Sequence, residues 1–203
     1  MKMNELINNI YSQILKIRTN LAIFYKFLLF IVPFLTIAYY FIFISSILPS
    51  NVAAKYSAII IAYFIPPAGK ESIIPIMLSD KIGPPISPWI TGSTIVILDV
   101  ISCAIIAYNW WFAEFIINRI GILKRGYRIL QKKAEKFRKR RSLTFALLLF
   151  MIIPFQGTGG ISTTIISKLL GLSANRTTAI VFAGSTITTS LWILWWLGFL
   201  NFL

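Results

Sequence analysis

The chain has 203 residues, of which 57% are hydrophobic and 13% charged, and it carries a formal net charge of +14. Because a soluble domain has about 25% charged residues, this composition excludes an ordinary soluble protein and predicts an integral membrane protein with one domain over residues 1–203. Eleven of the 20 basic residues lie between residues 119 and 141, a clustering that is typical of a cytoplasmic segment facing anionic lipid and that argues against nucleic acid as a partner.

The first half of the chain contains four predicted elements. Residues 1–26 place apolar side chains near helical spacing between polar ones, and they predict an amphipathic helix at the membrane interface. Residues 27–48 predict a membrane-spanning helix in which Pro33 is a tolerated kink. Residues 53–82 are apolar but interrupted by proline and glycine, and residues 88–111 predict a second spanning helix with aromatic residues at both ends.

The second half contains three more predicted elements. Residues 112–142 predict a basic amphipathic helix on the cytoplasmic side. Residues 143–171 are again apolar and interrupted by proline and glycine, and residues 178–203 predict a final spanning helix. We therefore expect an all-α integral membrane protein.

The two interrupted segments share a template of Ile-Pro, two residues and Gly, and other features recur after them. These features are Ile65 and Ile153 at the start of each template, then Gly83 and Gly171, then the tetrapeptide "GSTI" at Gly92 and at Gly184. The first two pairs are offset by 88 residues and the third by 92, and a four-residue insertion in the connecting loop is expected to explain the change. The chain is thus predicted to contain two copies of a unit made of a broken hairpin, a short loop and a span.

The charges at either side of the first interrupted segment predict its path. The basic N-terminal arm and residues 112–142 both belong in the cytoplasm, so an even number of crossings must separate them. Three apolar segments lie between, so the interrupted one must be re-entrant, and Lys168 and Arg176 require the same of the second. The hairpin tips then meet near the bilayer centre. We expect the cytoplasmic (inner) membrane, with the N-terminus cytoplasmic and the C-terminus extracytoplasmic.

The tips of the two hairpins form the candidate site. Each returning arm begins at its tip, so free backbone N–H groups and the positive end of the helix dipole face the bilayer centre and favour an anion such as phosphate or carboxylate. Lys70 adds a full charge, and neighbouring side chains add hydrogen bonds. The predicted substrate-binding residues are Gly69, Lys70, Ser72, Gln156, Gly157, Thr158 and Gly159.

Two carboxyl groups, Glu71 and Asp99, are expected within the membrane, where charges are costly and often functional. They are interpreted as ion- or proton-coupling groups, or alternatively as partners of Lys70 that only hold the fold together. The small residues of Gly184–Ser190 are interpreted as close helix packing. With one cysteine, Cys103, and no histidine, we expect no metal site, no cofactor and no enzyme activity.

The segments "GKESIIPIMLSDKIG" and "IIPFQGTGGISTTIISKLLGL" resemble the first and second hairpins of the small multi-drug export protein family of prokaryotic membrane proteins, over about residues 53–200. That family is similar to the DedA, or VTT-domain, superfamily. The resemblance implies paired re-entrant hairpins and translocation of lipid phosphates such as polyprenyl phosphate. DedA proteins usually place arginines around the second hairpin proline, where this chain has Gln156 and Thr158.

The expected function is therefore a transporter or flippase for an amphiphilic anion, best a lipid-linked phosphate. Two alternatives stay open: proton-coupled export of small hydrophobic compounds with Glu71 and Asp99 as carriers, and a non-transporting membrane scaffold. The expected partners are membrane lipids with anionic headgroups at residues 112–142, the substrate, and protons or sodium ions. A homo-oligomer is left open, and nucleic acid is not expected.

Overall fold

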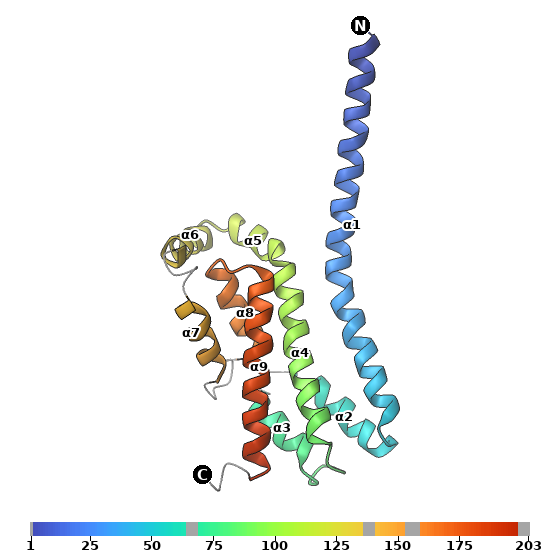
Figure 1. Ribbon diagram of the computed structural model, residues 1–203, viewed down its shortest axis with the longest axis vertical. Helices are drawn as coiled ribbons and strands as arrows, with labels where there is room; N and C mark the ends of the chain where they lie inside the picture. Colours follow the sequence, from blue (N-terminus) through green and yellow to red (C-terminus); the bar gives the residue numbers. More distant parts are fainter. Residues whose placement is uncertain (1, 64–68, 136–140, 153–158, 199–203) are drawn as a thin grey trace.

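The structure is a computed structural model that describes residues 2–63, 69–135, 141–152 and 159–198 (Figure 1). The described residues form nine helices and, apart from one isolated bridge between Lys81 and Gly83, no β-structure, which confirms the expected all-α fold. The helices are α1 (Lys2–Ile47), α2 (Ser50–Tyr63), α3 (Lys70–Leu78), α4 (Pro88–Tyr108), α5 (Trp110–Arg119), α6 (Gly121–Glu135), α7 (Arg141–Ile152), α8 (Gly160–Leu169) and α9 (Ala174–Trp196).

Three of the helices in the described part of the chain are long and apolar enough to cross a membrane, as expected of a multi-pass membrane protein. They are Phe24–Ile47 within α1, Pro88–Tyr108 (α4) and Ala174–Trp196 (α9). The last of these begins before the expected boundary at residue 178 because Ser173 caps it. The Ser173 hydroxyl accepts a hydrogen bond of 3.4 Å from the backbone N–H of Arg176. Residues 199–203 of the expected span lie outside the described residues.

The long helices form the centre of the molecule and the short ones flank it. In Figure 1, α1, α4 and α9 run along the long axis, and α4 and α9 share the most extensive contact. The α2–α3 pair lies near the end where α9 finishes, and the α7–α8 pair lies in the opposite half, near α5 and α6. Each pair runs inward and then back, so the two pairs enter the molecule from opposite ends. The start of α1 and the whole of α6 lie at one end, and α9 finishes at the other.

An apolar cluster fixes the first short pair against α4. Burial of such side chains is the main source of the packing energy. The cluster includes Tyr56 and Ile59 from α2, Ile73, Ile74 and Met77 from α3, and Ile95 and Leu98 from α4. The second short pair is held in part by Met151 of α7, which lies in a smaller cluster with Cys103 of α4 and Val181 of α9. Both pairs are thus anchored to the same central helices.

The glycines Gly83 and Gly171 agree with the predicted repeat, since both lie in the left-handed region, with φ of 79° and 76°. The expected insertion in the connecting loop is wrong. The loop from 79 to 87 is longer than its counterpart from 170 to 173. Gly92 lies near the start of α4 but Gly184 lies in the middle of α9, so the two GSTI motifs are not at matching depths. Each glycine instead serves a local contact.

Those local contacts explain why the GSTI tetrapeptide occurs twice although its two copies do not occupy equivalent positions in α4 and α9. A Cβ added to Gly92 would lie 3.1 Å from Ile193 Cδ1, which brings α4 close to α9. A Cβ added to Gly184 would lie 2.6 Å from Met151 Sδ, which brings α9 close to α7. Small residues let transmembrane helices approach closely, so the same short pattern arises wherever two helices cross.

The N-terminal region differs from the expectation. Residues 1–26 and 27–48 were predicted to form an interfacial helix and a separate span, but Lys2–Ile47 is one continuous helix. No glycine or proline lies between Met3 and Val32, so nothing interrupts the backbone hydrogen bonds where the turn was expected. Pro33 is accommodated inside the helix.

The basic segment over residues 112–142 also differs, because it was predicted as one helix. α5 ends at Arg119, Ile120 is extended with φ −100° and ψ 110°, and α6 begins at Gly121. Residues 136–140 lie outside the described residues, and Arg141 and Ser142 belong to α7. Gly121 has the lowest helix propensity of any residue but proline, which explains why the break falls beside it.

Gly83→Ala is expected to lower the free energy of unfolding by about 1–2 kcal/mol. The cause is backbone strain alone, because φ is 79° and the nearest atom to an added Cβ, Lys55 Cδ, is 3.9 Å away. The midpoint of thermal unfolding in detergent measures this effect. Gly126→Ala is the control, since an added Cβ there has nothing within 4 Å and lies in the helix α6. An unchanged midpoint for Gly83→Ala would contradict the left-handed turn.

Candidate functional site

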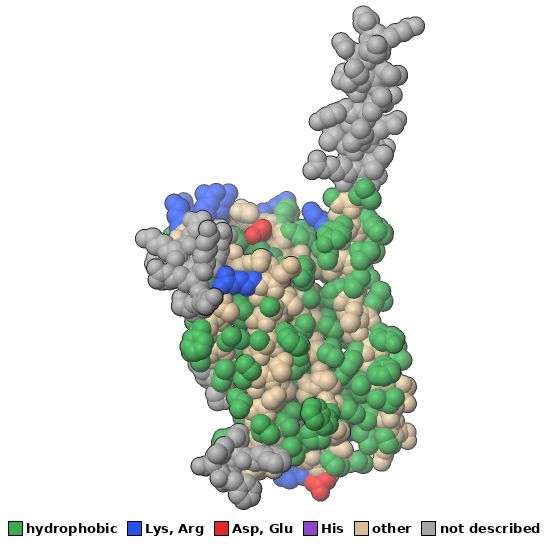
Figure 2. Space-filling view, viewed as in Figure 1, with side chains coloured by type: hydrophobic (Ala, Val, Ile, Leu, Met, Phe, Trp, Pro, Cys, Tyr) green, Lys and Arg blue, Asp and Glu red, His purple; other side chains and the backbone are tan. Residues whose placement is uncertain are grey.

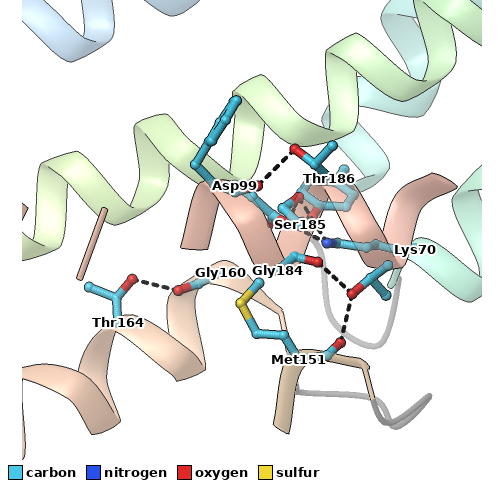
Figure 3. Close-up of polar contacts among 11 residues, drawn as sticks. Lys70, Asp99, Met151, Gly160, Thr164, Gly184, Ser185 and Thr186 are labelled. Carbon is cyan, nitrogen blue, oxygen red and sulfur yellow. Dashed lines mark hydrogen bonds and ion pairs between the residues drawn. The ribbon is translucent and has the colours of Figure 1, made fainter. Parts of the chain in front are cut away.

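Three polar side chains from three helices meet in the middle of the molecule (Figure 3). Lys70 is the first residue of α3, and its Nζ lies 2.6 Å from Asp99 Oδ2 of α4. The same Nζ donates a hydrogen bond of 3.0 Å to Ser185 Oγ of α9, and Ser185 Oγ donates one of 2.7 Å to Asp99 Oδ2. The Lys70 and Asp99 side chains are only 7% and 4% exposed. The two opposite charges are therefore paired and removed from solvent.

The second oxygen of Asp99 is bound from the other side of the first break. Tyr63, the last residue of α2, donates a hydrogen bond of 2.6 Å from its hydroxyl to Asp99 Oδ1. Tyr63 lies just before the break, and Lys70 follows Gly69 just after it. Both residues thus contact the same carboxylate. The chain between them, residues 64–68, lies outside the described residues.

The start of α3 is what places Lys70 there. Gly69 precedes the helix in an extended conformation, with φ −124° and ψ 179°, and provides no side-chain cap. Its carbonyl accepts the first helical hydrogen bonds, from the backbone N–H groups of Ser72 at 3.1 Å and Ile73 at 2.9 Å. Because Ile73 is buried in the apolar cluster on α4, the first turn of α3 is held against that helix and its lysine reaches Asp99.

The second short pair delivers another helix N-terminus to the same carboxylate. α8 begins at Gly160, after Gly159 in an extended conformation. A Cβ added to Gly160 would lie 3.0 Å from both Asp99 Cβ and the Asp99 carbonyl oxygen, so only glycine allows this approach. The N-terminus of a helix carries partial positive charge. The N-terminus of α8 and the Lys70 ammonium group from the first turn of α3 therefore both lie against Asp99, and the protein's own carboxylate is the anion that they face.

Glu71, the residue after Lys70, supplies a second carboxylate in the first turn of α3. A Cβ added to Gly69 would clash with the Glu71 carboxylate atoms, so this side chain folds back over the start of α3. Its Oε1 atom is buried and has no hydrogen-bond partner among the described residues. A buried acceptor without a donor is costly, and an added proton or cation would satisfy it.

Buried hydroxyl groups continue from the site along the contact of α4 and α9 and along α8. Towards the end where α9 finishes they are Thr94, Thr91, Thr188 and Thr189, and in the other half they are Ser102, Thr177, Thr163, Thr164 and Ser167. Thr91, Thr177 and Thr189 have hydroxyl oxygens with no hydrogen-bond partner within the described ranges. Buried hydroxyl groups thus lie on both sides of Asp99, whereas hydrophobic side chains are spread over the face of the molecule in Figure 2.

The structure brings together some of the predicted site residues. Lys70 and Asp99 form the ion pair, Glu71 follows Lys70 in the first turn of α3, and Gly69 and Gly159 precede the two helices. Ser72 is half-buried in the first turn of α3, and no described contact joins its side chain to the pair. The predicted residues Gln156, Gly157 and Thr158 lie outside the described residues. Within the described part of the chain, no group of three Cys, Asp or Glu side chains could hold a metal ion.

Three residues of the site were not predicted as such. Tyr63 and Gly160 are adjacent to the breaks in the sequence, and a hydroxyl or a glycine at the end of a broken helix is the signal that would have found them. Ser185 belongs to Gly184–Ser190, which was interpreted as helix packing. That interpretation holds for Gly184, but the next residue contacts both charges of the pair.

Comparison with known proteins gives one result. A family model described as "Putative small multi-drug export protein" matches residues 74–191, which is 191 − 74 + 1 = 118 of the 203 residues and more than half of the chain. The matched region includes Asp99, Gly160 and Ser185 and begins shortly after Lys70. No curated protein and no solved structure matches the chain.

Lys70→Met and Asp99→Asn are each expected to lower the free energy of unfolding by about 3–5 kcal/mol, because each leaves one buried charge without its partner. The double variant should be less destabilised than either single variant, since it removes both charges. Thermal unfolding in detergent measures the four proteins, and Lys81→Met on the exposed loop is the matched control. Additive losses in the double variant would show that the two charges do not depend on each other.

Proposed function

The chain belongs to the small multi-drug export protein family, and on that premise we propose that it is a membrane transporter that exports small hydrophobic compounds in exchange for protons. In this proposal, the proton and the exported compound compete for Asp99. The observation that carries this proposal is the buried ion pair between Lys70 Nζ and Asp99 Oδ2, which are 2.6 Å apart at the point where two broken helices begin. Charged groups inside membrane proteins typically mark substrate, ion or proton pathways.

Asp99 can exchange Lys70 for another cation, but it cannot easily remain without one. Breaking a buried ion pair by removing one charge costs about 3–5 kcal/mol, so Lys70 leaves Asp99 only if another cation replaces it. A proton or a cationic group of the exported compound meets that condition. Because the proton and the compound need the same carboxylate oxygens, they bind in turn, and that alternation couples their movements.

Glu71 gives the released Lys70 a second acceptor. Its buried Oε1 has no hydrogen-bond partner among the described residues, and it belongs to the same first turn of α3. When a proton neutralises Asp99, the lysine side chain would pair with the ionised Glu71 instead, and the net charge of the three groups would change from −1 to 0. Tyr63 and Ser185 then provide the hydroxyl groups that hold the protonated carboxyl group in place.

The lengths of the short helices support a re-entrant path for both broken segments. α2, α3, α7 and α8 have 14, 9, 12 and 10 residues. At 1.5 Å per residue the longest reaches about 21 Å, whereas the hydrocarbon core is about 30 Å thick. None of these helices can cross alone, and each pair returns to the end from which it entered. In this proposal the buried hydroxyl groups beyond the tips give polar access from each side.

The orientation in the membrane follows from charge. Lys and Arg side chains gather at the end of the molecule where α5 and α6 lie (Figure 2), among them exposed Arg119, Arg125 and Arg128. Basic segments are retained on the cytoplasmic side and attract anionic lipids. This end, with the start of α1, is therefore the cytoplasmic one in our proposal, and α9 finishes on the opposite side of the inner membrane.

A second candidate function is translocation of a lipid-linked phosphate such as polyprenyl phosphate. Lys70 at the start of α3 and the N-terminus of α8 both lie against Asp99, and this observation favours it, because the lysine and a helix N-terminus could hold a phosphate once Asp99 is protonated. Export by proton exchange is better supported, since Lys70 is already paired with a carboxylate of the chain. A scaffold without transport, the third alternative, gives no reason for an ion pair at the helix breaks.

In proteoliposomes, the protein is expected to drive a cationic hydrophobic dye out against an opposite proton flux, recorded with a pH-sensitive dye on the other side. The double variant Lys70→Met with Asp99→Asn should fold but reduce both fluxes to those of empty liposomes. Asp80→Asn, which changes an exposed carboxylate, is the control and should transport normally. Dye movement without proton flux would contradict the exchange. Flipping of labelled polyprenyl phosphate by the wild type, with no dye movement, would establish the second candidate instead.

Cysteine labelling in a Cys103→Ser background tests the orientation. Ser87 in the α3–α4 loop and Arg125 in α6 are both exposed, on opposite ends of the molecule. A membrane-impermeant maleimide is expected to label Ser87→Cys in intact cells and Arg125→Cys only after the membrane is opened. Labelling of both positions from the same side would contradict the paired re-entrant segments.

A further inference from the structure

The first helix extends far beyond the rest of the molecule. α1 begins at Lys2, whereas its membrane-spanning stretch begins at Phe24. The 22 residues before Phe24 cover about 33 Å at 1.5 Å per residue. In Figure 1 this part of α1 continues the line of the span and lies away from the other helices. The function proposed above does not use it.

The sequence of this extension has a seven-residue repeat. Starting from Met3, apolar residues follow at alternating steps of four and three, namely Ile7, Ile10, Ile14, Ile17 and Leu21. Of the other 14 residues between Lys2 and Leu21, 11 are polar. A repeat of this kind, with a period of 3.5 residues, is the pattern of helices that wind around one another in a left-handed coiled coil.

The same steps continue without a shift into the membrane-spanning stretch, where the side chains are described. The next positions are Phe24, Leu28, Ile31, Leu35, Ala38 and Ile42. Leu21, Phe24, Leu35 and Ile42 are 63%, 60%, 62% and 65% exposed and Ile31 is half-buried, so the chain's own helices leave most of the described part of this stripe uncovered. The positions from Met3 to Ile42 are called the α1 stripe below.

The opposite face of α1 makes the contacts within the chain. Ile44 is buried, Phe41 stacks on Tyr56 of α2, and the Tyr40 hydroxyl lies 3.0 Å from Ser93 Oγ and 3.2 Å from Thr94 Oγ1 of α4. Residues two apart are about 200° apart around a helix, so Tyr40 and Ile44 face away from Ala38 and Ile42. From Leu21 on, where the side chains are described, the α1 stripe thus faces away from these contacts and can bind another molecule while α1 stays docked on α4.

We propose that the α1 stripe binds the same stripe of further copies of this chain in a parallel coiled coil. The helices are parallel because all copies enter the membrane in one orientation. Isoleucine occupies both kinds of core position, with Ile7 and Ile14 in one and Ile10 and Ile17 in the other, and this composition favours a trimer over a dimer.

The positions of the charged residues and the contact area of α1 are both consistent with another copy of this chain as the partner. In the repeat, Lys2, Glu5, Lys16 and Lys26 fall at positions away from the core and its flanks. Arg18 flanks the core, but its counterpart across a parallel contact is Gln13, so no two basic residues oppose each other. A helix is about 10–12 Å wide, so the 22-residue extension alone offers about 350 Å² on each copy. All 46 residues of α1 offer roughly 700–800 Å², close to the ~800 Å² per partner of a stable interface. The contact therefore includes the span as well as the extension.

A membrane surface is the other partner that an apolar stripe could have, and the backbone argues against it. A helix that lies on the membrane must turn away from the direction of the span. α1 has no glycine or proline from Met3 to Val32 and is continuous through Lys26. The extension therefore points away from the membrane, and its apolar stripe needs a partner in water.

Disulfide cross-linking of the full-length protein in native membranes tests the contact. In a Cys103→Ser background, Ile14→Cys places a thiol in the proposed core, and Ser12→Cys places one on the outer side of the same turn. With an oxidant, most of the Ile14→Cys chains are expected to become linked to another copy while the Ser12→Cys chains stay single. Equal linking at both positions, or linking at neither, would overturn the proposal.

Light scattering in detergent gives an independent readout. The wild type is expected to have the mass of three 23.0 kDa chains, and Ile10→Asp should reduce it to one chain without lowering the unfolding midpoint of the membrane domain. Ser12→Asp, with the same added charge on the outer side, should keep the wild-type mass. A single-chain mass for the wild type, or an unchanged mass for Ile10→Asp, would overturn the coiled coil. A spin label at residue 14 that reports a lipid environment would also overturn it, because the extension would then lie on the membrane.

Discussion

The ion pair between Lys70 and Asp99 is the interaction on which the interior of this protein depends. Its two charges are almost fully buried, and a charge at that depth must be paired or neutralised. Meeting that requirement draws on four helices, since Tyr63 of α2 and Ser185 of α9 also contact Asp99. The position of the first break follows, because Lys70 reaches Asp99 only from the first turn of a helix that begins there.

The second break meets the same carboxylate through its backbone. Gly160 brings the N-terminus of α8 against Asp99 at a distance that no side chain would allow. A helix N-terminus stabilises a nearby negative charge, and in a medium of low dielectric this effect is stronger than in water. The two breaks therefore complement each other: the first contributes a full positive charge and the second a partial one.

Local patterns in the sequence predicted the elements better than the contacts between them. The breaks, the spans and the matching Gly83 and Gly171 follow from composition and from residues a few positions apart. Ser185 could not be found that way, because it lies 115 residues from Lys70 and 86 from Asp99. Its pairing depends on how α4 packs on α9. The continuous α1 was missed for a different reason, since an amphipathic pattern alone does not distinguish an interfacial helix from one that continues a span.

A buried ion pair also suits transport because of how its energy is divided. Desolvation of the two charges offsets most of their attraction, so the net contribution of such a pair to stability is small, whereas one unpaired charge costs about 3–5 kcal/mol. Exchanging the cation that pairs with Asp99 therefore changes the free energy little, whereas leaving Asp99 or Lys70 unpaired is strongly unfavourable. In the proposed cycle, this difference prevents Lys70 from moving before a proton or a cationic compound has arrived. The movement of the proton is then strictly coupled to that of the compound because an unpaired buried charge is unfavourable. This coupling needs no separate gate.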